Sequence, residues 1–346
     1  MLKIGNVKLK HRWILAPMAS ISDLPFRMLN RSFGCECAFV EMINARCLGY
    51  KSIKTRQMLA SEAKDRPLGV QLLGCEPEFI ARGMDIMSRY TFDIMDFNAA
   101  CPERKVTRRG EGASLLKDPV KLQKLVAIVV KLSAVPVTVK IRTGWDERTV
   151  NAPEVASRIQ DAGAKAVFIH GRTKQQGYSG TVDYRAIESV KKAVSIPVVA
   201  SGDIFTARLA GKMFDETGCD GVLVARGALG NPWIFQELDE YFIRGKAPTR
   251  PTVERISDVM LEHLRLCIDF HGERVGAVTF RKFFIWYTWG HHSVRHLRQH
   301  ATSAKTGLQM QAVIEEFCSH ARRDSKSKDD PWAASLSPGH ISPPQP

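Results

Sequence analysis

The chain has 346 residues, of which 44% are hydrophobic and 25% are charged, a composition typical of a globular protein with a sizeable core. Its formal net charge of +14 favours a polyanionic partner, such as a nucleic acid or an anionic membrane surface. The eight cysteines are scattered and form no C-x-x-C pair, which excludes a disulfide framework and a zinc site. No segment has the length of a membrane span or the pattern of a signal peptide, so we expect a cytoplasmic protein with free thiols, no metal and no membrane association.

Short apolar runs alternate with helical patterns over the first 245 residues. The runs predict strands at 13–18, 37–42, 68–73, 92–98, 135–142, 166–171, 196–202 and 221–227. The segments between them predict helices at 23–33, 52–61, 77–90, 118–132, 152–162, 183–194, 204–217 and 232–243. Nearly continuous apolar strands are typical of a parallel sheet that is covered on both faces. This α/β pattern predicts a (β/α)8 TIM barrel at 1–245, because an open doubly wound sheet would need a glycine-rich turn where APMAS stands.

The pattern changes after Gly245, where KAPTRPT has the composition of a linker. Amphipathic helices are predicted at 252–271, 275–290 and 303–319, and no strand is predicted among them. We therefore expect a second, all-helical domain at 246–320. The stretch 321–346 is rich in Ser, Pro and charge and is expected to be disordered. Nothing in the sequence indicates a stable protein partner.

Polar and small residues gather where the predicted strands end, which in a TIM barrel is the active-site face. They are Pro17, Met18, Ala19, Glu41, Gln71, Asn98, Cys101, Lys140, Arg142, His170, Ser201, Gly202, Asp203, Ala225, Arg226 and Gly227. The strand bodies read as apolar. We therefore expect these residues to line a ligand site.

The loops after the last two strands predict a phosphate site. SGD at 201–203 and ARG at 225–227 supply glycines, backbone N–H groups and the charge of Arg226. One such loop is equally well explained by a tight turn, but two together favour phosphate. Lys140 would place a positive charge beside an anion that forms during reaction. Gln71 carries an amide that can pair with the edge of a pyrimidine-dione, and His170 is interpreted as a ligand contact over a core histidine.

Cys101 lies where the fourth strand stops, and Pro102 fixes the backbone after it. No histidine stands beside it in the sequence to mark a cysteine protease, and a thiol can also act as a general acid toward carbon. The basic residues Arg104, Lys105, Arg108 and Arg109, together with Arg142, are expected to line the rim, bind phosphates and lower the pKa of the thiol. The simpler alternative is a solvated basic loop beside an inert thiol.

Eight motifs carry a resemblance to a known family. They are ILAPMASISDLPFR, VQLLG, FNAACPERKV, GASLLKDP, VTVKIRTGW, IHGRTKQQGYSG, IPVVASGDI and VARGALGNPWIF. In this order and spacing they resemble the tRNA-dihydrouridine synthases of the bacterial type, flavoenzymes that reduce uridine in RNA. The resemblance runs to residue 243 and, more weakly, through the helical region to 320.

The resemblance implies bound FMN and NADPH as the reductant. By analogy, Pro17, Met18 and Ala19 would pack under the isoalloxazine, Gln71, Lys140 and His170 would contact it, and Ser201, Gly202, Asp203, Ala225 and Arg226 would hold the ribityl chain and phosphate. A uridine flipped out of tRNA would receive hydride at C6 from the flavin and a proton at C5 from Cys101, while Asn98 held the ring.

The chain departs from the family pattern at Ala100, where Asn-x-Gly-Cys-Pro is usual. A glycine there would allow backbone angles that alanine resists, and the methyl group would crowd the base. The departure bears on the substrate rather than on the role of Cys101.

The helical region independently favours RNA, because residues 277–310 contain no Asp or Glu. Basic residues in this span, Arg281, Lys282, Arg295 and Arg298 among them, are expected to contact phosphates. The aromatic residues between them are expected to pack the helices.

Three alternatives stay open. A flavin barrel that acts on a small molecule, such as dihydroorotate dehydrogenase, predicts no basic helical domain. A non-catalytic RNA-binding barrel predicts loss of Gln71, Cys101 and Lys140, all of which are present. A dihydrouridine synthase acting on ribosomal RNA would share all these residues.

Overall fold

The structure is a computed structural model that describes residues 1–48, 53–249, 251–291 and 294–324. The chain forms two compact units. The first comprises 1–227 and 234–245, and the second comprises 228–233 and the residues from Lys246 onward. The boundary at 245–246 is the one expected from the sequence, but the segment 228–233, expected in the barrel, groups with the helices.

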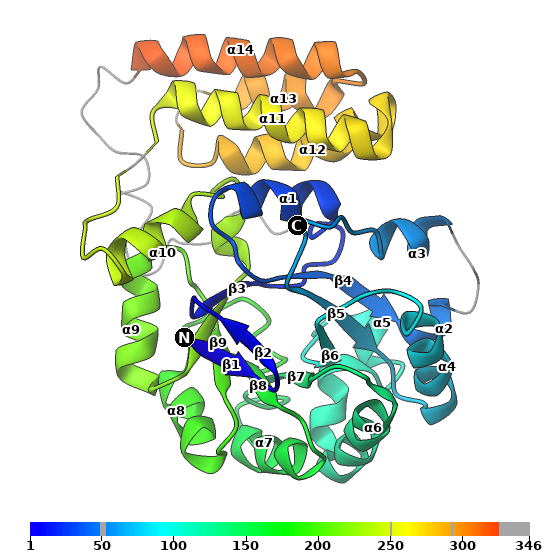
Figure 1. The fold of residues 1–346 in the computed structure, drawn as a ribbon. Coiled ribbons are helices and arrows are strands. Elements are labelled where there is room, and N and C mark those ends of the chain that lie inside the picture. Colours follow the sequence, from blue (N-terminus) through cyan, green and yellow to red (C-terminus); the bar gives the residue numbers. More distant parts are fainter. Residues whose placement is uncertain (49–52, 250, 292–293, 325–346) are drawn as a thin grey trace. The chain divides into compact units, whose positions relative to one another are not determined.

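Eight parallel strands close into a barrel in the first unit, which confirms the predicted TIM barrel (Figure 1). They are β3 (Trp13–Leu15), β4 (Ala38–Asn44), β5 (Leu68–Leu73), β6 (Ile94–Ala99), β7 (Val137–Arg142), β8 (Ala166–His170), β9 (Val198–Ser201) and β10 (Gly221–Val224). β10 pairs with β3 to close the ring. β4 and β6 run past their predicted ends to Asn44 and Ala99, and the other strands lie within the predicted ranges.

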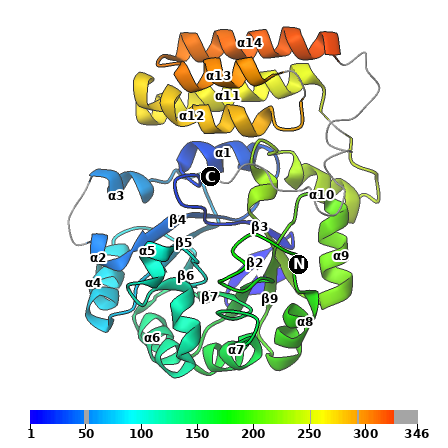
Figure 2. The ribbon, with the colours of Figure 1, turned by 180° about the vertical axis from the view of Figure 1, so that it is seen from behind.

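Helices surround the barrel, as both views of the ribbon show (Figures 1 and 2). They are α1 (Leu24–Ser32), α2 (Ala45–Leu48), α3 (Ile53–Met58), α4 (Pro77–Met87), α6 (Pro119–Leu132), α7 (Ala152–Asp161), α8 (Tyr184–Ala193), α9 (Ala207–Thr217) and α10 (Ile234–Phe242). Their ends carry ordinary signals: the side chains of Asp23, Asp118, Asp183 and Thr206 accept N-cap hydrogen bonds. Gly218, with φ of 63°, ends α9 in the left-handed conformation.

A short hairpin at the start of the chain belongs to the barrel core. Its strands β1 (Leu2–Ile4) and β2 (Val7–Leu9) are antiparallel, and Leu2, Ile4 and Leu9 join the same hydrophobic cluster as Ile14 and Phe168. The hairpin is not predictable from the sequence pattern, because strands of three residues are too short to establish a period.

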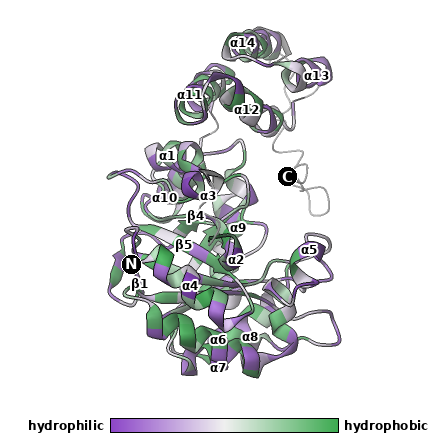
Figure 3. Cartoon of the chain, turned by 90° about the vertical axis from the view of Figure 1, so that its right-hand side faces the viewer, coloured by the Kyte–Doolittle hydropathy of each residue, from purple (hydrophilic) through white to green (hydrophobic). Residues whose placement is uncertain are grey.

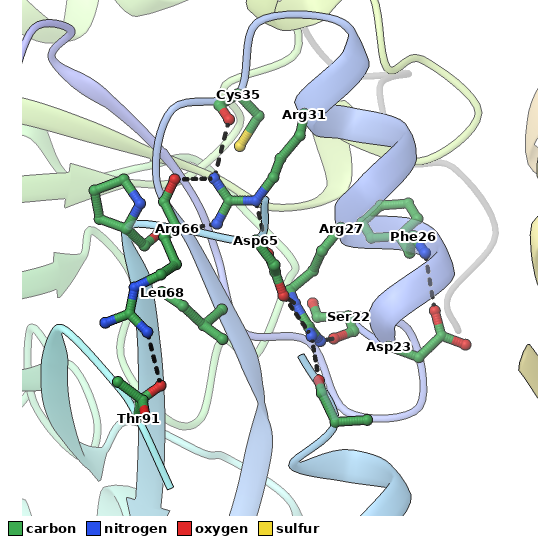
Figure 4. A network of polar contacts seen from close by, with 12 residues as sticks. Ser22, Asp23, Phe26, Arg27, Arg31, Cys35, Asp65, Arg66, Leu68 and Thr91 are labelled. Carbon is green, nitrogen blue, oxygen red and sulfur yellow. Dashed lines mark hydrogen bonds and ion pairs between the residues drawn. The ribbon is translucent and has the colours of Figure 1, made fainter. Parts of the chain in front are cut away.

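Helix α1 is fixed to the chain before β5 by a buried ion network (Figure 4). Arg27 and Asp65 are both fully buried, and their ion pair spans 2.8 Å. Arg31 donates to the other carboxylate oxygen of Asp65 at 2.6 Å, and Arg27 also donates to the carbonyls of Ser22 and Ala60. The network therefore joins α1 both to the segment before β5, through Asp65 and Ala60, and to the loop that follows β3, through Ser22.

The second unit contains α11 (Val253–His271), α12 (Glu273–Tyr287), α13 (Arg295–Ser303) and α14 (Gly307–Asp324). Aromatic side chains fill its core, as expected, with Phe280, Phe283 and Phe284 fully buried. Helix α13 lies in a stretch for which no element is predicted. Helix α14 extends to Asp324, past residue 321, where the disordered tail is predicted to begin. The rest of that prediction, 325–346, lies outside the described residues.

In Figure 3 the helices carry both hydrophilic and hydrophobic residues, as helices with one buried side do. On α8, for example, Ala186, Ile187 and Val190 are buried. Within the described ranges, no helix combines the length and the apolar character needed to cross a membrane.

We predict that Asp65→Asn lowers the free energy of unfolding by about 3–5 kcal/mol, because it leaves the buried guanidinium of Arg27 without its counter-charge. The matched control is Asp85→Asn, which breaks an ion pair whose partners Arg89 and Asp85 are 71% and 68% exposed. That change should cost about 0–1 kcal/mol. Denaturant titration measures both, and equal losses would contradict the role given to Asp65.

Candidate active site at the barrel mouth

The barrel interior changes from apolar to polar toward the C-terminal ends of the strands. Its apolar part includes Ile14, Phe39, Ile94, Phe168 and Leu223. The next layer is polar: Asp96 is hydrogen-bonded to Gln71 and Thr138. A further polar layer follows toward the strand ends and consists of Asn98, Lys140, His170 and Ser201. The strand-end residues expected from the sequence are thus brought together at one mouth.

A continuous chain of hydrogen bonds runs from the strand bodies to Cys101. Thr138 Oγ1 and Gln71 Nε2 donate to the two carboxylate oxygens of Asp96, at 2.6 and 2.7 Å. Asn98 Nδ2 donates to Gln71 Oε1 at 2.8 Å. Asn98 Oδ1 then accepts from the backbone N–H groups of Ala100 and Cys101, at 3.0 and 2.8 Å. We call Thr138, Asp96, Gln71 and Asn98 the buried polar chain.

Asp96 and Thr138 are functional candidates that were not predicted, because both lie in strand bodies that read as apolar. The signal was present: Asp96 interrupts the apolar run DIMDFN two residues before Asn98, so both side chains face the same side of β6.

A buried acid and a buried base are electrostatically coupled here. Burial raises the pKa of Asp96 to about 7, and Lys140 offsets part of that rise. Burial lowers the pKa of Lys140 to about 7, with Arg142 acting in the same direction and Asp96 in the opposite one. Lys140 Nζ lies 3.3 Å from Ser201 Oγ. Its charge therefore depends on the presence of an anion nearby.

His170 is buried at the end of β8 among cations. Burial lowers the pKa of His170 well below its usual value, and Arg142, Lys140 and Arg172 add to the effect. The imidazole is therefore neutral at pH 7. Its ring centroid lies 6.1 Å from that of Tyr178.

A cluster of charged residues occupies the predicted phosphate corner. Asp203, with φ of 54°, pairs with Arg172 at 2.5 Å and with Arg226 at 2.8 Å. Two guanidinium groups against one carboxylate leave the corner positive. Among the described residues Arg226 Nη1 is buried and has no hydrogen-bond partner, so it can still donate to a bound anion. Arg172 was missed, although it stands two residues after His170.

The two glycines of this corner serve the packing of the loops. A Cβ on Gly227 would lie 1.9 Å from the carbonyl oxygen of Ile204. One on Gly202, whose φ is 130°, would lie 2.8 Å from Val182 Cγ2. The simpler explanation, tight loop packing, therefore accounts for both glycines, and the expected contact of Gly202 with a ligand stays a prediction.

The loop after β3 forms an apolar platform beside the mouth. Met18 and Ala225 are partly buried and pack on the barrel core. Met18 N donates to Ser22 Oγ at 2.9 Å, and that hydroxyl donates to the carbonyl of Ala16 at 3.0 Å. Pro17 is half-buried and Ala19 is exposed in the same turn.

Cys101 is half-buried. Two hydrogen bonds that do not involve the buried polar chain also hold its loop in place. Arg142 Nε donates to the carbonyl of Ala100 at 2.9 Å, and Ala113 N donates to the carbonyl of Cys101 at 3.0 Å. Two elements absent from the sequence analysis follow it, α5 (Arg104–Thr107) and the 3-10 helix η1 (Gly112–Lys117).

Two expectations about this loop were wrong. Burial raises the pKa of the Cys101 thiol, although a lowered pKa was expected, because Arg142 and Lys105 offset only part of the desolvation. Arg142 is not a rim residue: it is 2% exposed and also donates to the carbonyls of Thr173 and Gly177. It clamps the neighbouring loops, while Arg104, Lys105, Arg108 and Arg109 are exposed, as expected.

Ala100 fits the loop without strain. Among the described non-glycine residues only Ser20 and Asp203 have a positive φ, so the backbone at 100 does not require glycine. The expected conflict of backbone angles is therefore absent.

The basic residues predicted to contact RNA in the second unit differ in their surroundings. Arg281 and Arg298 donate to carbonyls of their own unit, at Ala304 and Thr288. Lys282 Nζ lies 5.1 Å from the ring centroid of Phe283. Arg295 is exposed on α13. Contact of all four with RNA stays a prediction.

Residues 14–322 match the family model described as dihydrouridine synthase. The chain is 39% identical to a probable tRNA-dihydrouridine synthase of Rickettsia bellii, over 84% of this chain and 89% of that protein. It is 36% identical to tRNA-dihydrouridine synthase B of Vibrio vulnificus, over 91% and 98% respectively. Among solved structures, morphinone reductase shares the fold, with a TM-score of 0.53, 15% identity and coverage of 74% of this chain and 91% of that one.

We predict that iodoacetamide alkylates Cys101 along a pH profile displaced to higher pH than that of a small free thiol. The raised pKa leaves less thiolate at a given pH, and the thiolate is the nucleophile. Peptide mass spectrometry of the native protein measures the rate, with the exposed Cys47 as an internal check of reagent access. A Cys101 profile displaced to lower pH would contradict the assigned environment.

Proposed function

The chain belongs to the dihydrouridine synthase family, and on this premise we propose that it reduces uridines of tRNA to 5,6-dihydrouridine, with FMN as the bound cofactor and NADPH as the reductant. The observation that carries the proposal is the position of a protonated thiol, Cys101, which is hydrogen-bonded to Asn98. Asn98 is the strand partner of Lys140, and the ends of the later strands carry the positive corner at Arg226.

The chemistry of the mouth fits FMN. Nη1 of Arg226, which has no hydrogen-bond partner in the described part of the chain, suits a phosphate oxygen. Ser201, Gly202, Asp203 and Ala225 line the same strand ends and would hold the ribityl chain, while Pro17, Met18 and Ala19 offer the apolar platform for the ring. When bound, the cofactor supplies a hydride, taken from NADPH, to C6 of the uracil ring.

The flavin ring would be contacted by three side chains that set the charge and the hydrogen bonds around it: Lys140, His170 and Gln71. A negative group beside Lys140 raises the pKa of the ammonium from its value of about 7, so the lysine is fully charged when an anion is there to be stabilised. His170 is neutral and can accept or donate one hydrogen bond without adding charge. Gln71 keeps one amide hydrogen and one lone pair for a ligand after its two contacts in the buried polar chain.

Cys101 would act as the general acid. Its raised pKa keeps the proton on Sγ at neutral pH. The S–H bond breaks as the C–H bond forms at C5 of the uracil, and the thiolate that remains takes a proton from water through its half-exposed position. Asn98, anchored three residues earlier, would hold the ring.

RNA binding would use the exposed cations around the mouth, Arg104 and Lys105, and the basic helices of the second unit. Such contacts are made to phosphates, and so the affinity should fall steeply with salt. The target uridine must leave its stack to reach a thiol at the barrel mouth.

We predict that Cys101→Ala leaves FMN binding and NADPH oxidation intact and lowers the rate of dihydrouridine formation by about 100-fold to 10,000-fold, the usual contribution of a general acid. Mass spectrometry of nucleosides from the treated tRNA measures the product. The control is Cys47→Ala, which removes an exposed thiol from α2. A normal dihydrouridine yield from Cys101→Ala would remove the thiol from the reaction.

We further predict that Arg226→Gln weakens FMN binding about 10-fold to 150-fold, the effect of losing a charge-assisted hydrogen bond of about 1.5–3 kcal/mol. The control is Arg208→Gln, which changes an exposed residue of α9. Fluorescence titration of the apoprotein with FMN measures both. Equal affinity in the two variants would argue against a phosphate at this corner.

A further inference from the structure

We propose that Asp96 is a positioning residue for Cys101: its carboxylate sets the orientation of the Gln71 and Asn98 amides and thereby fixes the peptide that carries the thiol. The inference rests on the proposed function in one respect, namely that Cys101 is the reacting thiol. It concerns a residue that lies in the strand body of β6 and not at the active-site face.

The direction of the buried polar chain begins at Asp96. Both carboxyl oxygens of Asp96 act as hydrogen-bond acceptors in this arrangement. Its Oδ1 accepts from Thr138 and its Oδ2 accepts from Gln71. Gln71 must therefore present its amide nitrogen to Asp96 and its carbonyl oxygen to the other side.

The orientation of Asn98 follows from that of Gln71. Because Gln71 Oε1 is an acceptor, Asn98 presents Nδ2 to it and leaves Oδ1 for the N–H groups of Ala100 and Cys101. A flipped Asn98 would direct its NH2 group at two N–H donors and leave them unsatisfied. The buried polar chain thus connects Asp96 to the backbone of Cys101, and each donor and acceptor along it has a single compatible orientation.

Burial prevents water from replacing a broken link. Asp96 and Thr138 are 0% exposed, Gln71 is 1% exposed and Asn98 is 5% exposed. In such surroundings an unmatched donor or acceptor is costly, so the loss of one link is transmitted to the next. The loop itself survives, because Arg142 and Ala113 hold it independently. The expected effect is a misplaced thiol in a folded protein.

The test compares Asp96→Asn with Asp96→Leu. The Asn variant can accept from Gln71 through its oxygen and donate to the Thr138 hydroxyl through its nitrogen, so the chain keeps its order. The Leu variant has the same number of side-chain heavy atoms, branched at the same position, and no acceptor. Thr138→Val is the matched control, because it removes a hydrogen bond to Asp96 of equal burial that does not lie on the path to Cys101.

The first readout is the alkylation rate of Cys101 in the protein without RNA, relative to Cys47 in the same sample. Asp96→Leu should change the rate by about fivefold or more, the size expected when a hydrogen bond is lost, while Asp96→Asn and Thr138→Val stay within about twofold. A purely structural role for Asp96 predicts that the rate follows the thermal stability across all three variants, and that result overturns the inference.

The second readout is steady-state dihydrouridine formation. Asp96→Leu should lower kcat with the KM for tRNA unchanged, and Asp96→Asn should restore it. If the wild-type protein forms no dihydrouridine, the proposed function fails, and the alkylation series still decides on the buried polar chain. If Asp96→Leu does not fold, Gln71→Met cuts the next link and should give the same change in alkylation. A wild-type rate in Gln71→Met would then overturn the inference.

Discussion

The carboxyl group of Asp96 lies inside a closed barrel, and the organisation of the mouth depends on the side chains that hydrogen-bond to it and stabilise it there. Gln71 and Thr138 satisfy its oxygens, and Lys140 is the cation that offsets the rise in its pKa. A buried carboxylate without such partners would be expelled or protonated. Two of these partners, Gln71 and Lys140, are also side chains that we propose to contact the cofactor, so the groups that stabilise Asp96 also shape the proposed site.

The mouth beyond this layer carries several positively charged side chains. Together with burial, these charges determine the protonation states of His170 and Cys101. Burial lowers the pKa of His170 and keeps it neutral, and the charges of Arg142, Lys140, Arg172 and Arg226 act in the same direction. Cys101 stays protonated because desolvation outweighs the nearby cations. The mouth therefore combines cationic side chains, which we propose to bind an anionic cofactor, with a neutral acid at its edge, and this combination suits the proposed reduction by hydride and proton.

The sequence was sufficient for the barrel and for the residues at the strand ends, because alternating apolar runs and helices determine a register in which strand exits meet. It could not show which of those residues are buried. Arg142 ends β7 as expected, but only its contacts with Ala100, Thr173 and Gly177 reveal a clamp. Asp96 could have been recognised as a charge within an apolar run, but the sequence could not show that its partners come from β5 and β7. Helix α13, with only Leu297 and Ala301 buried, has too weak an apolar pattern to be recognised.

The most direct test of the account follows electrons anaerobically. The flavin of the purified protein is reduced with NADPH, unmodified tRNA transcript is added, and the return of the oxidised-flavin absorbance is recorded, with quinone and fumarate as control acceptors. The account predicts rapid reoxidation by tRNA and none by the small acceptors. Reoxidation by quinone or fumarate alone would contradict an RNA substrate, and a purified protein without flavin would contradict the cofactor.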